Sequence, residues 1–313
     1  MQKKFKVLLN GGLGFIGQRF IEKYSKKYDI VVYAKKKDIS NFKDSIYLKN
    51  VIVEDGMTED LKIFKVITKY SPDVIIHLAA LTGLKKCDDD PEKAFKVNVF
   101  GTYNALDACS KIKSKFMFIS SREVYGDTEG DKSSEDNPLR PNNVYGITKK
   151  IGEELVQSMS KKHEFDFTIL RLTNVYGPKG NQYGAQIIVK DALFKSKIRI
   201  LGGNQHLNYV YVDDIVDLMD LVIQDERSSK QVFNVGSEES ITIEEFANTV
   251  IELLNKKIEI EYHPMRATET SRFNPDLTKL KNKLNYTAKT SLKEGLTKTI
   301  KWYSEDKNMF TSK

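Results

Sequence analysis

Phe5-Lys6-Val7-Leu8-Leu9-Asn10-Gly11-Gly12-Leu13-Gly14-Phe15-Ile16-Gly17 decides the fold, because an apolar run ends there in a glycine-rich turn that a helical pattern follows. This order predicts a strand, a tight turn and a helix. Glycines at this spacing let the backbone approach a pyrophosphate, and the helix N-terminus offers that group unpaired N–H groups and a partial positive charge. A tight turn without a ligand is the other interpretation. The residues expected to contact a dinucleotide are Gly11, Gly14, Phe15, Ile16 and Gly17.

The bulk composition predicts one large or two modest folded domains. The chain has 313 residues, of which 40% are hydrophobic and 30% are charged, so a core can form and disorder is not expected. Its apolar runs are all shorter than the roughly 18 residues of a membrane span, and the first residues lead into a strand without a signal peptide. The two cysteines, Cys87 and Cys109, are too few for a disulfide framework. These features predict a cytoplasmic protein.

The net charge of +7 leaves two interpretations of the surface open. A basic chain can bind nucleic acid, but the lysines are scattered along the sequence and are not gathered in a block. A solvated surface that attracts phosphorylated small molecules fits this distribution better. The histidines show no metal-ligand spacing, so no metal site is expected. His77, in an apolar run at the end of a strand, is expected to be packed in the core.

Strand-like runs alternate with helical patterns through the first half of the chain. The expected strands are Phe5–Leu9, Ile30–Ala34, Val51–Glu54, Val74–Leu78, Phe116–Ser120 and Phe167–Arg171. Helical patterns lie at Leu61–Tyr70, Pro91–Ser110 and Tyr145–Lys162, and Asp90 before Pro91 is a good helix start. This alternation predicts an α/β fold, a Rossmann-type doubly wound parallel sheet that binds ligands at the carboxyl ends of its strands.

The alternation loosens after about Leu172, where a smaller mixed α/β lobe is expected. Gly177-Pro178-Lys179-Gly180 is a turn-rich break, and the later patterns are short. Strands are expected at Ile198–Leu201, Tyr209–Val212 and Val232–Val235. The expected division is interleaved: residues 1–171 and 209–235 form a dinucleotide-binding domain, and residues 172–208 and 236–308 form a C-terminal substrate-binding lobe.

The end of the second strand bears on the choice of cofactor. An acidic residue about 20 residues after the glycines usually holds the adenosine ribose hydroxyls, but Ala34 stands there, followed by Lys35, Lys36 and Lys37. Three ammonium groups could receive a 2′-phosphate, which favours NADP over NAD. Alternatively, these lysines are solvated loop residues and backbone groups hold the hydroxyls. After the third strand, Asp55-Gly56 is placed to contact adenine or to form a plain turn.

Tyr145 and Lys149 lie four residues apart at the start of a predicted helix, so both face one side. A tyrosine with its ordinary pKa of about 10 is a poor base at neutral pH, and a neighbouring ammonium lowers that pKa. Ser121, where the fifth strand leaves the sheet, could donate to the same substrate oxygen or cap the strand end. With a nicotinamide beside them, these three residues make a hydride-transfer site, in which Lys149 also bonds the cofactor ribose. Glu123 could be an acid/base group or a loop carboxylate paired with Arg122.

Further motifs make the chain resemble an extended short-chain dehydrogenase/reductase of the nucleotide-sugar epimerase/dehydratase family over nearly its whole length. Besides the glycine turn, they are His77-Leu78-Ala79-Ala80, Asn98-Val99-Phe100-Gly101-Thr102, Ser120-Ser121, Tyr145–Lys149, Arg171-Leu172-Thr173-Asn174-Val175-Tyr176-Gly177-Pro178, Tyr211-Val212-Asp213-Asp214 and Phe233-Asn234-Val235-Gly236. The resemblance implies cofactor contacts by Leu78, Ala79, Ala80, Asn98 and Ser120.

The same resemblance implies where a substrate and a second subunit would bind. Ser121 and Arg122 would contact the sugar, Asn174 would contact the pyrophosphate of the sugar nucleotide, and Arg266 and Glu269 would lie in the nucleotide-sugar pocket. In the family, the two helices expected at Pro91–Ser110 and Tyr145–Lys162 pair across a dimer interface as a four-helix bundle. A homodimer is therefore expected, with no nucleic-acid or membrane partner.

The chain departs from the family's pattern in two places. Leu207 stands where the family often has an arginine that contacts the substrate nucleotide. Dehydratases carry Thr-Asp-Glu or Thr-Ser-Glu where this chain has Ser121-Arg122-Glu123. Glu123 thus matches the carboxylate that takes the C5 proton, while Arg122 replaces the group that helps the C6 hydroxyl leave. The family also places the loop of Cys87 near the sugar, where a covalent role is open beside a plain structural one.

The resemblance implies an NAD(P)-dependent oxidoreductase or epimerase that transfers a hydride at C4 of a nucleotide-linked sugar. The outcome stays open between a 4-keto-sugar reductase, a C4 oxidation and a 4-epimerase. An exchangeable NADP favours the reductase, and a tightly held NAD favours the other two. One alternative is a nucleotide-sugar 4,6-dehydratase that uses Glu123. Another, of a different class, is a non-catalytic cofactor-sensing or RNA-binding relative, which only the positive charge supports.

Overall fold

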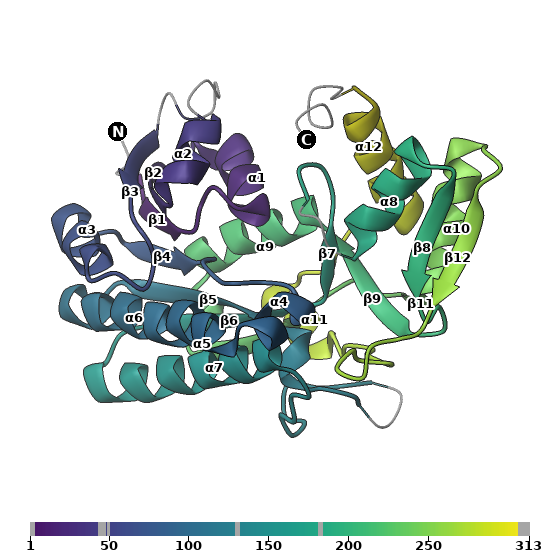
Figure 1. Ribbon diagram of the computed structural model, residues 1–313. Coiled ribbons are helices and arrows are strands. Elements are labelled where there is room, and N and C mark those ends of the chain that lie inside the picture. The colour runs from purple at the N-terminus through teal and green to yellow at the C-terminus, as the bar shows by residue number, and fades with distance from the viewer. Residues whose placement is uncertain (1–3, 43–47, 49–50, 129–131, 181–183, 306–313) are drawn as a thin grey trace. The chain divides into compact units, whose positions relative to one another are not determined.

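The computed structural model describes residues 4–42, 48, 51–128, 132–180 and 184–305 (Figure 1). Its internal contacts divide the chain into two units. Unit 1 comprises Met1–Gly126, Pro138–Arg171 and Leu218–Phe233, and unit 2 comprises Asp127–Asn137, Leu172–Asp217 and Asn234–Lys313. This division is interleaved, and it differs from the expected boundaries in placing residues 127–137, 209–217 and 234–235 with unit 2. The assignment of cofactor binding to one part and substrate binding to the other stays a prediction.

In the described part of the chain, a seven-stranded sheet has the order β10-β6-β5-β4-β1-β2-β3. Its strands are β1 (Lys6–Asn10), β2 (Asp29–Ala34), β3 (Val51–Asp55), β4 (Val74–His77), β5 (Lys115–Ser121), β6 (Phe167–Leu172) and β10 (Gln231–Val235). β1 pairs in parallel with β2 and β4, β2 with β3, and β4 with β5. The predicted Rossmann-type sheet is confirmed, with small shifts at the strand ends.

The order of the strands reverses between β1 and β4. The chain leads outward from β1 to β2 and β3, and then crosses back to β4 on the other side of β1. The backbone N–H of Leu78, directly after β4, donates to Asn10 O at the end of β1 at 2.9 Å. In open α/β sheets, ligands bind at this switch point, outside the carboxyl ends of the strands.

The helices of unit 1 include all those expected, one of them interrupted, and two short ones, Lys36–Phe42 and Leu84–Asp89, that the sequence did not predict. They are α1 (Phe15–Tyr24), α2 (Lys36–Phe42), α3 (Lys62–Tyr70), α4 (Leu84–Asp89), α5 (Pro91–Phe95), α6 (Gly101–Ile112) and α7 (Val144–His163), with 3-10 turns at Arg122–Val124 and Glu226–Ser228; α9 (Val212–Gln224) spans both units. The single helix expected over residues 91–110 is α5 and α6 joined by a π-helical turn, Lys96–Phe100. The expected helix start is confirmed, since Asp90 accepts from the N–H of Lys93 at 3.1 Å.

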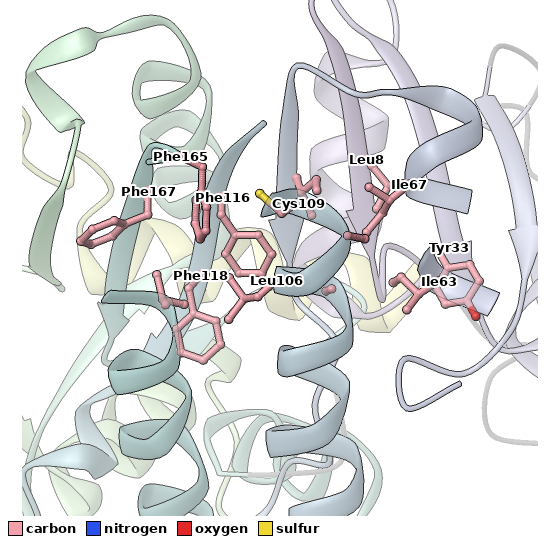
Figure 2. Packing of buried hydrophobic residues seen from close by; sticks show 14 of the residues in the cluster. Leu8, Tyr33, Ile63, Ile67, Leu106, Cys109, Phe116, Phe118, Phe165 and Phe167 are labelled. Carbon is pink, nitrogen blue, oxygen red and sulfur yellow. The ribbon is translucent and has the colours of Figure 1, made fainter. Parts of the chain in front are cut away.

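A hydrophobic core lies between the sheet and helices α3, α6 and α7 (Figure 2). Phe116 and Phe118 of β5 pack with Leu106 of α6, and Ile63 and Ile67 of α3 extend the same cluster. Because side chains alternate along a strand, their neighbours in sequence point to the other face of the sheet, where they are also buried. Burial on both faces explains why these strands read as nearly continuous apolar runs.

Unit 2 contains two small sheets and four helices among the described residues. Its elements are β7 (Asn174–Tyr176), α8 (Ala185–Phe194), β8 (Lys197–Leu201), β9 (His206–Tyr211), β11 (Ser240–Thr242), α10 (Ile243–Leu254), β12 (Glu259–His263), α11 (Thr278–Leu284) and α12 (Leu292–Glu305). β9 pairs with β7 and β11, which takes residues 209–211 out of the main sheet. β7 and β11 escape sequence prediction because three residues are too few to show a periodicity.

Two kinds of feature are absent from the described residues. Among those residues, no helix combines the length and the apolarity that crossing a membrane requires. In that same part of the chain, no group of three or more His, Cys, Asp or Glu side chains could hold a metal ion.

Candidate active site

Helix α1 starts directly after the glycine turn, with Gly14 as its exposed N-cap residue. The first turn carries no acidic residue, and no side chain caps it. Gly11 has a φ of 79°, and a Cβ at Gly17 would lie 2.3 Å from Gly12 O, so both positions require glycine. The N–H groups in the first turn of a helix have no hydrogen-bond partner within the helix. Together with the exposed glycine beside them, they can bind the pyrophosphate of a dinucleotide.

The segment after β4 lies against this turn. A Cβ at Gly11 would approach the Ala79 backbone to 2.7 Å, which places Leu78, Ala79 and Ala80 at the switch point. Asn98, in the π-helical turn, binds both backbone groups of Leu81, at 2.7 and 3.1 Å, and donates to Thr148 Oγ1 at 2.9 Å. The Asn98 side chain therefore connects the segment after β4 to α7. Cofactor contacts by these residues stay predictions.

The residues expected near the adenosine lie at the ends of β2 and β3. Ala34 is buried, whereas Lys35, Lys36 and Lys37 are all exposed where α2 begins. Ala34 O accepts from the N–H of Gly56 at 2.9 Å. The carboxylate of Asp55 forms an exposed ion pair with Lys62 at 2.8 Å, and this hydrogen bond lowers the pKa of Asp55.

The side chains of Ser121, Tyr145 and Lys149 meet where β5 ends and α7 begins. Asn143 caps α7 by accepting from the N–H of Gly146 at 2.8 Å. The Ser121 hydroxyl accepts from the N–H of Glu123 at 3.2 Å, and its own proton is donated to the Tyr145 phenol oxygen. Lys149 Nζ lies 5.9 Å from the centre of the Tyr145 ring. The structure therefore brings together the three residues that the sequence singled out.

The protonation of these groups follows from burial. Burial raises the pKa of Tyr145, the charges of Cys87 and Glu123 raise it further, and the hydrogen bond from Ser121 lowers it. Burial also lowers the pKa of Lys149 to about 8, against the opposing effect of Glu153. The expectation that Lys149 would lower the Tyr145 pKa is wrong for this arrangement. The reason is that Lys149 Nζ donates to Ile119 O at 2.8 Å and does not reach the phenol oxygen.

Glu123 and Arg122 form a buried ion pair, which is one of the two arrangements the sequence allowed. Arg122 Nη2 lies 2.8 Å from Glu123 Oε1, with the two side chains 8% and 7% exposed. The other oxygen, Oε2, accepts from Asn143 Nδ2 at 2.9 Å. Each carboxylate oxygen of Glu123 therefore already holds a donor.

The model of the NAD dependent epimerase/dehydratase family matches residues 7–236. The chain belongs to this family. It is 30% identical to UDP-glucuronic acid decarboxylase 5 of Arabidopsis thaliana, over 94% of this chain and 88% of the relative. It is 28% identical to dTDP-D-glucose 4,6-dehydratase of Dictyostelium discoideum, over 97% of this chain and 82% of the relative.

Solved structures of the epimerase/dehydratase family agree with this membership. UDP-glucose 4-epimerase of Thermotoga maritima, solved with UDP-glucose, has a TM-score of 0.88 and 27% identity, covering 96% of this chain and 98% of its own. UDP-glucose 4-epimerase of Thermus thermophilus, in complex with NAD, has a TM-score of 0.86 and 25% identity, covering 96% and 99%. The protein is thus an enzyme of the epimerase/dehydratase family.

In this family member, His77 is a packed residue, as expected. Its Nδ1 lies 2.9 Å from Asn10 Nδ2, and its Nε2 lies 3.1 Å from Thr102 Oγ1. Because the Thr102 hydroxyl donates to Asn98 O at 2.6 Å, it accepts from His77, and the ring is neutral with its proton on Nε2. Burial, with the charge of Lys149, lowers the pKa of His77 to about 3.

Cys87 is also buried, with Sγ 3.4 Å from Leu81 O. Burial raises the pKa of this thiol to about 11. Since the thiolate is the nucleophile, this environment disfavours a covalent role for Cys87 at neutral pH.

The substrate residues expected from the resemblance that follow Leu172 all lie in unit 2. Asn174 Nδ2 donates to Asn208 O at 3.0 Å, which joins β7 to β9. Arg266 Nη1 forms an ion pair with Glu269 Oε1 at 3.0 Å. Leu207, where the family often has arginine, is only 7% exposed on β9. Contacts of Asn174, Arg266 and Glu269 with a sugar nucleotide stay predictions.

The sequence did not predict a buried network of hydrogen-bonded charged side chains that begins one helical turn after Lys149. Glu153 on α7 and Arg171 on β6 form an ion pair at 2.7 Å, with exposures of 1% and 5%. Arg171 also donates to Tyr125 Oη at 2.7 Å, and the Ser120 hydroxyl donates to Glu153. One signal was available: a charged residue inside an otherwise apolar strand needs a buried partner, and Glu153 lies one turn after Lys149.

Proposed function

We propose that the protein acts at C4 of a nucleotide-linked sugar as an NAD(P)-dependent oxidoreductase or epimerase. The observation that carries this proposal is the hydrogen bond between Ser121 and Tyr145, with Lys149 one helical turn away. The names of the relatives support it, since UDP-glucuronic acid, dTDP-D-glucose and UDP-glucose are all nucleotide-linked sugars.

The three side chains have distinct proposed roles. Tyr145 takes the proton of the C4 hydroxyl, and Ser121 donates a hydrogen bond to the same oxygen. Because burial raises the Tyr145 pKa, loss of its proton depends on the Ser121 hydrogen bond, which lowers that pKa. A bound nicotinamide dinucleotide, held by the glycine turn and Lys149, supplies the partner for hydride transfer at C4.

The arrangement of Glu123 bears on the outcome of the reaction. A 4,6-dehydratase needs a base for the C5 proton, and Glu123 matches that position by resemblance. Here Arg122 and Asn143 donate to its two oxygens at 2.8 and 2.9 Å, so each oxygen already holds a donor and the carboxylate is paired with a cation. This favours the reductase, C4-oxidation and 4-epimerase outcomes over the dehydratase.

A substrate screen tests the proposed function. UDP-, GDP-, CDP- and dTDP-linked sugars and their 4-keto forms are incubated with the protein and NAD(H) or NADP(H), and the nicotinamide absorbance is followed. Epimerised product is measured by chromatography, because a 4-epimerase leaves no net change in the cofactor. Turnover of at least one sugar nucleotide is expected. No turnover in either assay, together with RNA binding that weakens steeply with salt, would support the non-catalytic alternative.

For the cofactor, we propose that the exposed lysines at the end of β2 select NADP. Replacing Lys35 and Lys36 by alanine is expected to lower the NADP-over-NAD preference roughly tenfold, which corresponds to about 1.4 kcal/mol. The ratio of dissociation constants is measured by nicotinamide fluorescence. Lys65→Ala, an exposed lysine of α3, is the control and should leave the ratio unchanged. Release of tightly held NAD from purified protein, identified by mass spectrometry, would contradict this choice.

We also propose that the protein is a homodimer. The exposed fractions are 61% for Phe100, at the end of the π-helical turn, 47% for Tyr103 on α6 and 37% for Ile147 on α7. Helices α6 and α7 lie side by side (Figure 1). Pairing this apolar face with a second copy would bury it. Phe100→Asp is therefore expected to give a monomer by light scattering, while Phe194→Asp, at an exposed residue of α8, stays dimeric. A monomeric native protein would refute the proposal. The cytoplasmic location stays a prediction.

A further inference from the structure

Glu153 is a fully buried carboxylate that joins three elements of unit 1. From β6, Arg171 Nε reaches Glu153 Oε1 at 3.0 Å, and Arg171 Nη2 reaches Oε2 at 2.7 Å. From β5, the Ser120 hydroxyl donates to Oε1. Glu153 itself lies on α7, so these bonds fix the position of α7 on the two strands. Ser120 directly precedes Ser121, which ties the same contact to the proposed active site.

Arg171 extends this connection to the segment after β5. Its Nη1 donates to the phenol of Tyr125 at 2.7 Å, and its guanidinium carbon lies 4.9 Å from the centre of the Tyr125 ring. Tyr125 is buried and ends the short turn that carries Arg122 and Glu123. One guanidinium therefore holds that turn and α7 in a fixed relation.

Stability alone does not account for a buried ion pair at this position. Well-packed apolar residues of similar volume often serve as well or better, because removing two charges from water is costly. Apart from Thr168 and Arg171, β6 is apolar, with the sequence Phe-Thr-Ile-Leu-Arg-Leu. An apolar pair at these two positions would place no negative charge one helical turn from Lys149, whereas Glu153 does.

We propose that Glu153 and Arg171 are a positioning pair for Tyr145 and Lys149. Glu153 and Arg171 set α7 on the sheet so that Tyr145 meets Ser121, and the carboxylate of Glu153 keeps the Lys149 ammonium charged. This inference rests on the proposed function only in treating Tyr145 and Lys149 as active-site residues.

The other groups that face Lys149 cannot supply this charge. Burial lowers the pKa of Lys149 to about 8, and Glu153 opposes that shift. On α4, Cys87 is a thiol at neutral pH because burial raises its pKa to about 11. On β4, His77 is neutral. β5 contributes the Ile119 carbonyl and the ring of Phe118, 5.0 Å from Nζ, and α7 contributes the neutral phenol of Tyr145.

Two substitutions separate the electrostatic role from a merely structural one, because they act on Lys149 with opposite signs. Glu153→Gln removes the negative charge and leaves Arg171 positive, so the Lys149 pKa is expected to fall by about 1 unit or more. Arg171→Met leaves Glu153 without its cation, so the Lys149 pKa is expected to rise. The pKa is read by NMR titration of protein labelled with ¹³Cε-lysine, with the Lys149 signal assigned through Lys149→Met. No substrate or cofactor is needed.

Leaving either charge unpaired in the interior destabilises the fold strongly, so thermal unfolding is measured first. If a single variant does not fold, the double variant Glu153→Gln, Arg171→Met decides, since it leaves no buried charge unpaired. Its Lys149 pKa is expected below that of the native protein, because the charge of Glu153 raises the Lys149 pKa and Arg171 is not among the main charges that shift it. Opposite shifts in the single variants, or a lowered pKa in the double variant, support the proposal. Shifts of one sign, or an unchanged Lys149 pKa, overturn it, whether or not any sugar nucleotide is turned over.

Discussion

Tyr145→Phe is expected to lower turnover of the sugar nucleotide by roughly 10²- to 10⁴-fold, the usual contribution of a general acid or base. The substitution removes one hydroxyl from a partly exposed ring and breaks its hydrogen bond with Ser121. The glycine turn is untouched, so the dissociation constant of the nicotinamide cofactor should stay within about threefold of the native value. Steady-state turnover and a fluorescence titration measure the two quantities on the same preparation.

Matched controls make this result specific. Tyr103→Phe removes a hydroxyl from an exposed tyrosine of α6 and should leave turnover unchanged. Ser121→Ala should reduce turnover less than Tyr145→Phe, because it removes a hydrogen bond and not the proton acceptor. Native-like turnover by Tyr145→Phe would end the proposed role of this phenol.

Arg122→Ser is expected to start exchange of the C5 proton during turnover. A ketone at C4 makes the neighbouring C–H bonds acidic, and Glu123 acts on Tyr145 closely enough to shift its pKa. Without the guanidinium 2.8 Å from Oε1, one oxygen of Glu123 is released to accept a proton. An added general base contributes roughly 10²- to 10⁴-fold, so C5 exchange should rise by at least roughly 10²-fold. Deuterium uptake from D₂O into the sugar, measured by mass spectrometry, reports it.

Two further variants test whether Glu123 is the base that removes the C5 proton. Arg122→Lys keeps a cation beside the carboxylate and should show little exchange, and adding Glu123→Gln to Arg122→Ser should abolish it. The cofactor and product assays follow the C4 step separately. Normal C4 chemistry without C5 exchange in Arg122→Ser would show that the ion pair does not restrain Glu123.

The parts of the fold that could be predicted are those whose residue types are restricted by their local backbone conformation or burial. The glycine turn and the strand Phe5–Leu9 could be read directly, because special backbone angles and two-sided burial each restrict which residues are allowed. The pairing of Ser121 with Tyr145 came from their places at the ends of two elements. Family resemblance supplied the remaining order of motifs.

The parts that were not predictable depend on contacts between distant residues. The sequence around Glu153 gives no indication that its ion-pair partner is Arg171, 18 residues away. The direction of the Tyr145 pKa was wrong because it depends on burial and on where Lys149 Nζ points. The bond from Asn143 to Glu123 at 2.9 Å likewise follows from how α7 packs on the turn after β5.

The π-helical turn Lys96–Phe100 corrects the phase between two helices. A π turn contains one residue more than an α turn needs, and each residue of an α-helix rotates the chain by about 100°. Removing that residue would leave α5 in place and rotate everything after it by about that angle. Thr102 would then swing away from His77, and Leu106 would leave the core that it shares with Phe116. The segment therefore cannot lose even one residue without changing how α6 packs, although its amino-acid composition gives no sign of this constraint.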